Sequence, residues 1–260
     1  SGEADAAPRR RKLNRGPIQE SRRAGGMAGR AVTRWPREWQ SVAGGSFVDN
    51  ILVVKFGGSY ATTPDLLRWL KAIEATRMPV VIVPGGGPFA EAVRRYQPRI
   101  GFDDATAHEM AILAMEQFGL ALVGLGSRLV RASDDAGITA ALERGDIPVW
   151  MPRQMALAAP EIDRDWSVTS DSLAAWLAGH ISGARLCLIK QIDLPDDSTL
   201  AALTGAEIVD EAFSRVLNEA TDLYVAGPAD LSAAGINLGE GTIPGRRILR
   251  QPMPAASAPA

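Results

Sequence analysis

The chain has 260 residues, of which 46% are hydrophobic and 22% are charged, a balance typical of one globular domain with an appendage. Gly and Pro are numerous, at 26 and 17 residues, but they lack the strict period of a collagen-like chain. The single cysteine, Cys187, excludes a disulfide scaffold and a cysteine-based zinc site, and it favours a reducing compartment, so we expect a cytoplasmic protein.

The net charge of −2 is unevenly distributed along the chain. Residues 1–45 hold ten Lys and Arg against four Asp and Glu, whereas the remainder holds eighteen against twenty-six. We expect residues 1–45 to be a basic, disordered arm, residues 46–250 to form the folded domain, and residues 251–260 to be a disordered tail rich in Pro and Ala. The arm lacks the apolar core of a secretory signal. It is interpreted as an organelle transit peptide, a nucleic-acid tail, or sequence translated from upstream of Met27.

The hydropathy pattern predicts no membrane-spanning segment. The longest uncharged apolar run near the middle, residues 118–126, is far shorter than the roughly 20 residues that a membrane helix needs. We therefore expect no membrane partner, and we expect no nucleic-acid partner for the folded domain.

The regular part of the chain begins with a strand, a glycine turn and a helix. Residues 51–56 form an unbroken apolar run that ends at Gly57 and Gly58, which predicts a strand buried on both faces and then a tight turn. Thr63 and Pro64 open a helix. Its apolar positions recur at three- and four-residue spacing, at Leu66, Leu67, Leu70 and Ile73.

The same unit is repeated, and the alternation of helix and strand then continues. A second strand over residues 79–83 leads into the glycine loop 84–88 and a helix over 89–96. The elements expected after it are a long helical stretch over 105–131 interrupted near Gly119 or Gly124, a strand over 147–150, a loop and helix over 168–179, a strand over 186–190, a helix starting at 210–213 and a strand over 223–226. Serial βα units imply an α/β class, a three-layer α/β/α sandwich with a mainly parallel central sheet.

Two glycine-rich loops follow the first two strands, and ligands of parallel sheets bind at the carboxyl ends of the strands. Gly57 and Gly58, like the run from Gly85 to Gly87, allow backbone N–H groups to approach an anion. Each loop also leads into a helix N-terminus, whose dipole favours phosphate. The alternative is that these glycines only make tight turns. Neither loop matches the P-loop or the dinucleotide-binding fingerprint, so we expect a nucleotide site of another kind.

Lysine is rare in this chain and lies at the ends of two expected strands. Only four lysines, at positions 12, 55, 71 and 190, accompany twenty-four arginines. A lysine within an apolar strand is costly unless its ammonium meets an anion, so Lys55 is a candidate for neutralising a transferring phosphoryl group. Its alternative is a side chain that reaches from the strand end into water. For Lys190, an ion pair with Asp193 is an equal alternative.

Asp171 lies just before the apolar helical stretch 173–178. One interpretation is structural, as a helix cap or a first-turn acid. The competing interpretation is that its carboxylate orients the lysines by accepting hydrogen bonds from their ammonium groups.

Three segments together resemble the amino acid kinase family. They are the strand ending in Lys55-Phe56-Gly57-Gly58-Ser59, the loop 84–89 with its three glycines, and the stretch 168–175 with Thr169, Ser170 and Asp171. The resemblance extends over about residues 50–249. One departure is the stretch 191–195, which lacks the Asp-Gly turn of many relatives and so puts nucleotide contacts there in doubt.

The resemblance implies a role for each matching residue. Lys55 and Asp171 are the catalytic pair, in which Lys55 stabilises the transferring phosphoryl and Asp171 organises the lysine. The implied phosphate and acceptor contacts are Gly57, Gly58, Ser59, Gly85, Gly86 and Gly87, to which Asp104 and His108 are added as weaker candidates on the grounds given below. The implied nucleotide contacts are Thr169, Ser170, Lys190, Asp193, Gly239, Gly241 and Thr242, of which the last three close the ATP pocket. The implied cofactors are ATP and Mg²⁺, with water and phosphate oxygens rather than protein residues as the main metal ligands.

Within the family, the segments 101–119 and 165–176 most resemble the kinases of methanofuran and methylofuran biosynthesis, which serve one-carbon metabolism. This resemblance implies transfer of the ATP γ-phosphoryl to the phosphate of an aminomethyl-furanmethanol phosphate, giving a diphosphate. Such a nucleophile is already anionic, so positioning and charge neutralisation carry the rate without a strong base.

Polar residues around the helical stretch 105–131 receive weaker assignments. An ammonium group on the acceptor would favour carboxylates, and on charge alone the candidates are Asp103, Asp104, Glu109 and Glu116. His108 is either a contact to a substrate phosphate or a structural histidine. The core is expected to take the apolar residues at helical spacing, Met110, Met115 and Phe118.

Two other functions are compatible with the same motifs. One is a nucleotide- or oxyanion-binding protein on the same fold, like the relative that stores molybdate. The other is a kinase for a carboxylate, an isoprenoid phosphate or uridylate. Because family members usually assemble through helices that flank the sheet, the resemblance also implies a homo-oligomer, a dimer or larger.

Overall fold

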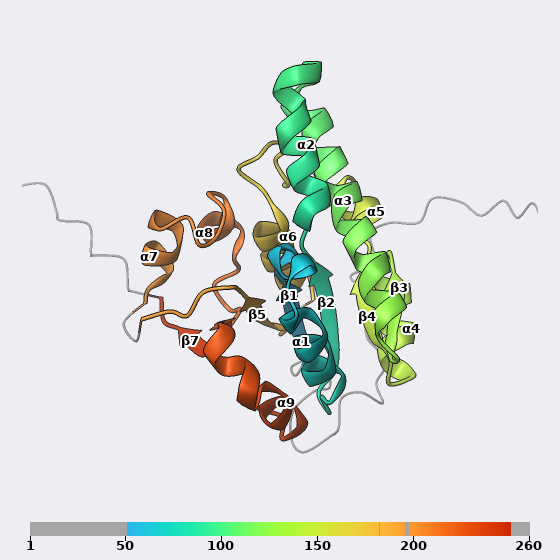
Figure 1. The fold of residues 1–260 in the computed structure, drawn as a ribbon, viewed down its shortest axis with the longest axis vertical. Helices are drawn as coiled ribbons and strands as arrows, with labels where there is room; N and C mark the ends of the chain where they lie inside the picture. The colour runs from blue at the N-terminus through green and yellow to red at the C-terminus, as the bar shows by residue number, and fades with distance from the viewer. Residues whose placement is uncertain (1–50, 182, 196–197, 251–260) are drawn as a thin grey trace, which may run out of the picture. The chain divides into compact units, whose positions relative to one another are not determined.

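The computed structural model describes residues 51–250, apart from residues 182, 196 and 197. Within that part of the chain, seven strands form one sheet in the order β3-β4-β2-β1-β5-β6-β7 (Figure 1). The strands are β1 (Leu52–Phe56), β2 (Val80–Pro84), β3 (Leu129–Ala132), β4 (Ile147–Trp150), β5 (Arg185–Ile189), β6 (Leu223–Ala226) and β7 (Arg246–Ile248). Every neighbouring pair is parallel except β6 with β7. The predicted α/β class with a mainly parallel sheet is confirmed.

Helices cover both faces of the sheet. The α-helices are α1 (Asp65–Glu74), α2 (Gly87–Ile100), α3 (Asp104–Leu125), α4 (Asp135–Glu143), α5 (Arg153–Ala156), α6 (Ser170–His180), α7 (Leu200–Gly205), α8 (Phe213–Val216) and α9 (Leu231–Gly239). Two short 3-10 helices are η3 (Gly58–Thr62) and η4 (Pro228–Asp230). One buried cluster joins α1 and α9 to the sheet, and a second joins α4, α6 and α8 to it, while α3 contributes to both. The two clusters are the interfaces of a three-layer sandwich.

The alternation of side chains along β1 decides which layer receives Lys55. Leu52, Val54 and Phe56 belong to the cluster under α1 and α9, whereas Val53 belongs to the cluster under α6. Because successive side chains of a strand point to opposite faces, Lys55 is on the Val53 face, toward α6. β1 is the central strand, flanked by β2 and β5. Lys55 therefore lies at the end of the central strand, where the connections to the strands on its two sides diverge. Ligands of parallel sheets usually bind in a crevice at such a point.

The prediction of an interrupted helix over 105–131 is wrong in two respects, the interruption and the position at which the helix ends. α3 runs unbroken through Gly119 and Gly124 and stops at Leu125, and residues 129–132 form the edge strand β3. The cause is distant in the sequence: the Glu74 carboxylate accepts hydrogen bonds from the backbone N–H groups of Ser127 and Arg128 at 2.5 and 2.7 Å. These bonds hold the chain extended, and β3 then pairs with β4.

Helix α1 packs on the sheet with three of the four predicted residues, Leu66, Leu70 and Ile73, and the prediction is wrong only for Leu67. Leu67 is 49% exposed, whereas Trp69 is fully buried. Leu66, Trp69, Leu70 and Ile73 share the face that packs on the sheet. Elements that the sequence did not predict are α4, α5, α7, α9 and β7.

No helix among the described residues is both long enough and apolar enough to cross a bilayer. The expected arm and tail, residues 1–45 and 251–260, lie outside the described residues, and the domain limits stay a prediction.

The packing of α1 predicts unequal costs for two truncations. Trp69→Ala removes a fully buried ring that packs edge-on against Tyr60 with centroids 6.4 Å apart, so we expect it to lower the free energy of unfolding by about 3–5 kcal/mol. Leu67→Ala is expected to cost less than about 0.5 kcal/mol, because half of that side chain is already in water. Urea unfolding followed by circular dichroism measures both values, and equal losses would contradict the assigned face.

Candidate active site

The two glycine loops touch each other backbone to backbone. A Cβ atom built on Gly58 would lie 2.1 Å from the backbone nitrogen of Gly87, and one built on Gly85 would lie 2.4 Å from that of Gly58. Gly87 also has a φ of +52°, which a side chain would strain. The loops therefore form one continuous floor of backbone at the carboxyl ends of β1 and β2, as an anion-binding cradle requires.

Lys55, Lys190 and Asp171 form a buried triad beside this floor. One carboxylate oxygen of Asp171 lies 2.9 Å from Lys55 Nζ, and the other lies 2.6 Å from Lys190 Nζ. Lys190 immediately follows β5, whose residues pair with β1, so the two ammonium groups arrive from adjacent strand ends. Both interpretations of Asp171 hold, because it is an acid in the first turn of α6 and its carboxylate also pairs with the two lysines. The alternative for Lys190, an ion pair with Asp193, is wrong, because Lys190 pairs with Asp171.

The first turn of α6 is fixed by a residue that the sequence did not single out. Asp210 accepts hydrogen bonds from the backbone N–H and the hydroxyl of Thr169, at 2.9 and 2.7 Å. It also accepts from the backbone N–H of Ser172 at 3.0 Å and from the Ser172 hydroxyl. Asp171 lies between Thr169 and Ser172, so the hydrogen bonds to Asp210 also fix the position from which the Asp171 carboxylate contacts the two lysines.

The triad carries one more positive than negative charge, and its pKa values reflect this excess. Burial alone would raise the pKa of Asp171, but the adjacent Lys55 and Lys190 outweigh burial and hold it below its ordinary value. Burial, followed by repulsion from Lys55, lowers the pKa of Lys190 to about 8, although Asp171 opposes this shift. The site is therefore electrostatically poised to receive an anion.

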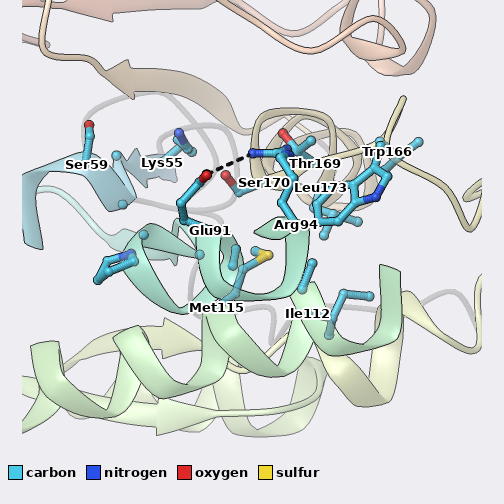
Figure 2. A pocket seen from close by; sticks show the side chains of 18 of the residues that line it. Lys55, Ser59, Glu91, Arg94, Ile112, Met115, Trp166, Thr169, Ser170 and Leu173 are labelled. Carbon is cyan, nitrogen blue, oxygen red and sulfur yellow. Dashed lines mark hydrogen bonds and ion pairs between the residues drawn. The ribbon is translucent and has the colours of Figure 1, made fainter. Parts of the chain in front are cut away.

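A cavity of about 570 Å³ opens above the glycine floor and the two lysines (Figure 2). Its walls are α2, α3, the loop before α6 and the first turn of α6. Ten residues expected at the site line it: Lys55, Gly57, Gly58, Ser59, Gly86, Gly87, His108, Thr169, Ser170 and Lys190. Gly85 lies in the floor, and Asp171 lies behind the lysines.

His108 is a buried histidine of the cavity wall. Its Nδ1 atom lies 3.1 Å from the carbonyl oxygen of Asp165, and the ring is 3% exposed. Burial is the largest cause that lowers its pKa, so the ring is neutral near neutral pH. A neutral ring favours the structural interpretation of His108 over a charged contact to a substrate phosphate.

Several expected site residues do not reach this cavity. Asp104 is exposed on α3 and accepts a hydrogen bond from Gln97 at 2.7 Å. Gly239 packs against Ala75 beyond the end of α1, at the amino ends of the strands and so at the opposite edge of the sheet from the lysines. Thr242, which directly follows Gly241, lies in the same region and donates hydrogen bonds from its hydroxyl and its backbone N–H to the carbonyl oxygen of Asn237. Gly239, Gly241 and Thr242 therefore do not line the cavity at the lysines, and their expected role in closing the ATP pocket stays a prediction.

The carboxylates expected to meet an ammonium group are engaged elsewhere. Asp103 caps α3 by accepting from the backbone N–H of Thr106. Glu109 pairs with the Arg153 side chain, and Glu116 accepts from the Arg153 backbone N–H. Two of the three expected core residues, Met115 and Phe118, are buried, but Met110 is 36% exposed.

The cavity contains residues that sequence reasoning missed. They are chiefly Glu91 and Arg94 on α2, Trp166 in the loop before α6, and Gln191. The available signal was helical spacing, because Glu91 and Arg94 follow Gly87 by four and seven residues and so share its face of α2.

A second cavity, of about 350 Å³, lies at the carboxyl ends of β5 and β6. Asp193, Gly227, Asp230 and Arg246 are among its lining residues. Asp193 accepts a hydrogen bond from the backbone N–H of Ala229 at 2.9 Å, which fixes its carboxylate at this rim. This cavity lies at the same edge of the sheet as the first, and Lys190 lies at the end of β5, which both cavities adjoin.

The contact between the glycine loops predicts a marked asymmetry between two glycine substitutions. Gly58→Ala forces the loops apart, and overpacking of this kind costs about 1–3 kcal/mol, so the melting temperature should fall by several degrees. Gly124→Ala is the matched control, because a Cβ there meets nothing within 4 Å and alanine is the better helix former. Calorimetry of both variants tests this, and a Gly58→Ala melting temperature equal to wild type would contradict the close contact.

Comparisons with known proteins agree with this geometry. The model of the amino acid kinase family matches residues 50–200. A [5-(aminomethyl)furan-3-yl]methyl phosphate kinase from Methanocaldococcus jannaschii is 25% identical over 180 residues, covering 64% of this chain and 82% of the relative. The uridylate kinase of Archaeoglobus fulgidus has a similar structure, with a TM-score of 0.55, 16% identity, and coverage of 77% of this chain and 100% of that one. The UMP kinase of Bacillus anthracis gives a TM-score of 0.53 at 17% identity, covering 76% of this chain and 94% of that one. The chain belongs to the amino acid kinase family and is a phosphotransferase.

Proposed function

We propose that this kinase transfers the γ-phosphoryl of ATP to the phosphate of [5-(aminomethyl)furan-3-yl]methyl phosphate or a similar small phosphorylated amine, producing a diphosphate. The observation that carries the proposal is the buried Lys55–Asp171–Lys190 triad, which opens with the glycine floor onto one cavity. The named relative that covers 64% of this chain supports the choice of acceptor.

In the proposed reaction, an oxygen of the acceptor phosphate attacks the γ-phosphorus, and the bond to the β,γ-bridging oxygen breaks to release ADP. No proton needs to be removed from an anionic phosphate oxygen, so the chain has to supply position and positive charge rather than a base. Backbone N–H groups of the floor would hold the acceptor phosphate. Lys55 would meet the transferring group, and Lys190 would meet the nucleotide phosphates.

The second cavity suits the remainder of the nucleotide. It adjoins the carboxyl ends of β5 and β6, on the side of Lys190 away from the acceptor cavity. Asp193, which the sequence assigned to the nucleotide, lines it. We therefore assign the base and ribose of ATP to this cavity.

The described residues offer no protein cage for Mg²⁺. No group of three or more His, Cys, Asp or Glu side chains among them is arranged to hold a metal ion. Each oxygen of Asp171 is already ion-paired with a lysine. Mg²⁺ use stays a prediction, with the ion carried by phosphate and water oxygens. The homo-oligomer also stays a prediction.

A panel of acceptors tests the proposed substrate. ADP release would be measured with ATP and Mg²⁺ against the furan phosphate, uridylate, isopentenyl phosphate and acetylglutamate. We expect turnover of the furan phosphate, with Lys55→Ala reducing kcat by about 10²–10³-fold because a preorganised charge is lost. Lys71→Ala is the matched control, since Lys71 is exposed on α1.

Each other outcome of the panel has a defined meaning. Exclusive turnover of another acceptor would contradict the furan assignment while leaving phosphoryl transfer intact. Nucleotide binding without turnover of any acceptor would instead support the binding or storage function.

The lowered pKa of Lys190 predicts a pH limit on activity. Lys190 is charged below about pH 8 and loses its charge as the pH rises through that value, so kcat/KM for ATP should fall above about pH 8. A bound nucleotide favours the ammonium form, so the fall in kcat should occur at higher pH than the fall in kcat/KM.

Lys190→Arg provides the control for this pH profile, because arginine stays charged throughout the range. The alkaline fall should be absent in that variant, whatever its absolute rate. The same fall in Lys190→Arg would show that another group causes it.

A further inference from the structure

The acceptor cavity is lined by groups of both charges. Lys55, Lys190 and the backbone N–H groups of the glycine floor make the floor of the cavity positive. Among the described residues that line the cavity, Glu91 is the only acid. A carboxylate in an anion-binding cavity repels its ligand unless the ligand also carries a positive charge. The position of Glu91 therefore indicates where a positively charged group of the acceptor would bind.

Glu91 lies at a definite distance from the glycine floor. It follows Gly87 by four residues on α2, so it shares the face of Gly87 and lies about 6 Å further along the helix axis. In Figure 2 its carboxylate points into the same space as Lys55 and Ser170. Because side chains of a helix tilt toward its N-terminus, the Glu91 carboxylate reaches back toward the floor, so a cation that meets it lies within about one helical turn of an anion on the floor. A single small ring between the phosphate and the cationic group of a ligand can span such a separation.

The partner of Glu91 within the chain holds it only weakly. Glu91 Oε2 lies 3.5 Å from Arg94 Nη1, and both side chains are more than half exposed. Exposed pairs of this kind contribute little. Arg94 has a second partner, because its guanidinium lies 4.3 Å from the centroid of the Trp166 ring. A ligand cation can thus pair with Glu91 while Arg94 stays on Trp166.

A hydrogen bond holds Trp166 in the wall around Glu91, and His108 in the same wall contributes no positive charge. Trp166 Nε1 donates to Gln97 at 2.7 Å, which fixes the indole against α2. His108 is buried and neutral near neutral pH, for the reason given above. The other charged residues among those that line the cavity are therefore Arg94, on the same helix as Glu91, and the two lysines at the floor.

We propose that Glu91 is a specificity-determining residue that pairs with a protonated amine on the acceptor, while the acceptor phosphate lies on the glycine floor. The inference rests on the proposed function in one respect, namely that the acceptor is a phosphorylated amine. It replaces Asp104, the carboxylate favoured by sequence, with one that lines the cavity.

Paired acceptors test the proposal. The furan phosphate would be compared with its analogue in which a methyl group replaces the aminomethyl group, and 4-(aminomethyl)benzyl phosphate with 4-methylbenzyl phosphate. Wild type should prefer the amine by about 2- to 5-fold in kcat/KM, as expected for an ion pair with a side chain that is more than half exposed. Glu91→Gln should bring the ratio close to one, chiefly by raising KM for the amine. Glu143→Gln, an exposed glutamate on α4, should leave the ratio unchanged.

The Arg94→Ala variant serves as a second background, which separates a direct contact of Glu91 with the acceptor from an indirect effect through Arg94. If Glu91 only positions Arg94, Glu91→Gln should have no effect on the ratio in an Arg94→Ala background. Our proposal expects the preference for the amine to persist in Arg94→Ala and to disappear in the double variant. An unchanged ratio in Glu91→Gln, or a loss that requires Arg94, would overturn it.

The design distinguishes failure of this inference from failure of the proposed substrate. If the furan phosphate is not turned over but the aminomethylbenzyl phosphate is preferred through Glu91, only the furan assignment fails. If no acceptor is turned over, equilibrium binding of the four phosphates in the presence of ADP gives the same ratio, and a ratio of one in wild type would overturn the inference.

Discussion

The sharing of one carboxylate between two lysines is the interaction on which the site depends. Asp171 bonds to Lys55 and Lys190 at 2.9 and 2.6 Å, and all three side chains are largely withdrawn from water. A single buried lysine would favour its neutral form, and a one-to-one ion pair would be neutral overall. Two lysines on one carboxylate keep a net positive charge in a buried place, which is what an incoming phosphoryl group needs.

The rest of the fold serves this arrangement. Adjacent parallel strands deliver the two lysines, and the face chosen by the alternation along β1 is the one covered by α6. Asp210 anchors the first turn of α6, and Tyr60 donates its hydroxyl hydrogen bond to the Lys190 carbonyl at 2.8 Å, which ties the loop after β1 to the end of β5. The glycine loops complete the surface by touching each other directly.

The acceptor cavity shows how one scaffold can select its substrate without altering its chemistry. Transfer depends on the strand ends and glycine loops, whereas the far wall is built from α2, α3 and the loop that carries Trp166. Side chains on that wall can change without disturbing the triad. Glu91 lies on this wall, so its charge bears on which acceptor binds rather than on how the phosphoryl group moves.

The sequence by itself determined the α/β class, the strands that carry the lysines and both glycine loops, because these depend on short apolar runs and turn residues. It left open whether Asp171 is a first-turn acid of a helix or holds the lysines, and only the family resemblance implied its pairing with Lys55. Only the tertiary structure decided that Lys190 joins Asp171 rather than Asp193, that Asp210 anchors α6, and that Glu91 rather than Asp104 faces the cavity. It also decided that Leu129–Ala132 is a strand, through Glu74, and that Gly239 lies at the opposite edge of the sheet. Each of these depends on a contact between residues far apart in the chain, and local pattern holds no information about which distant partner a polar group will meet.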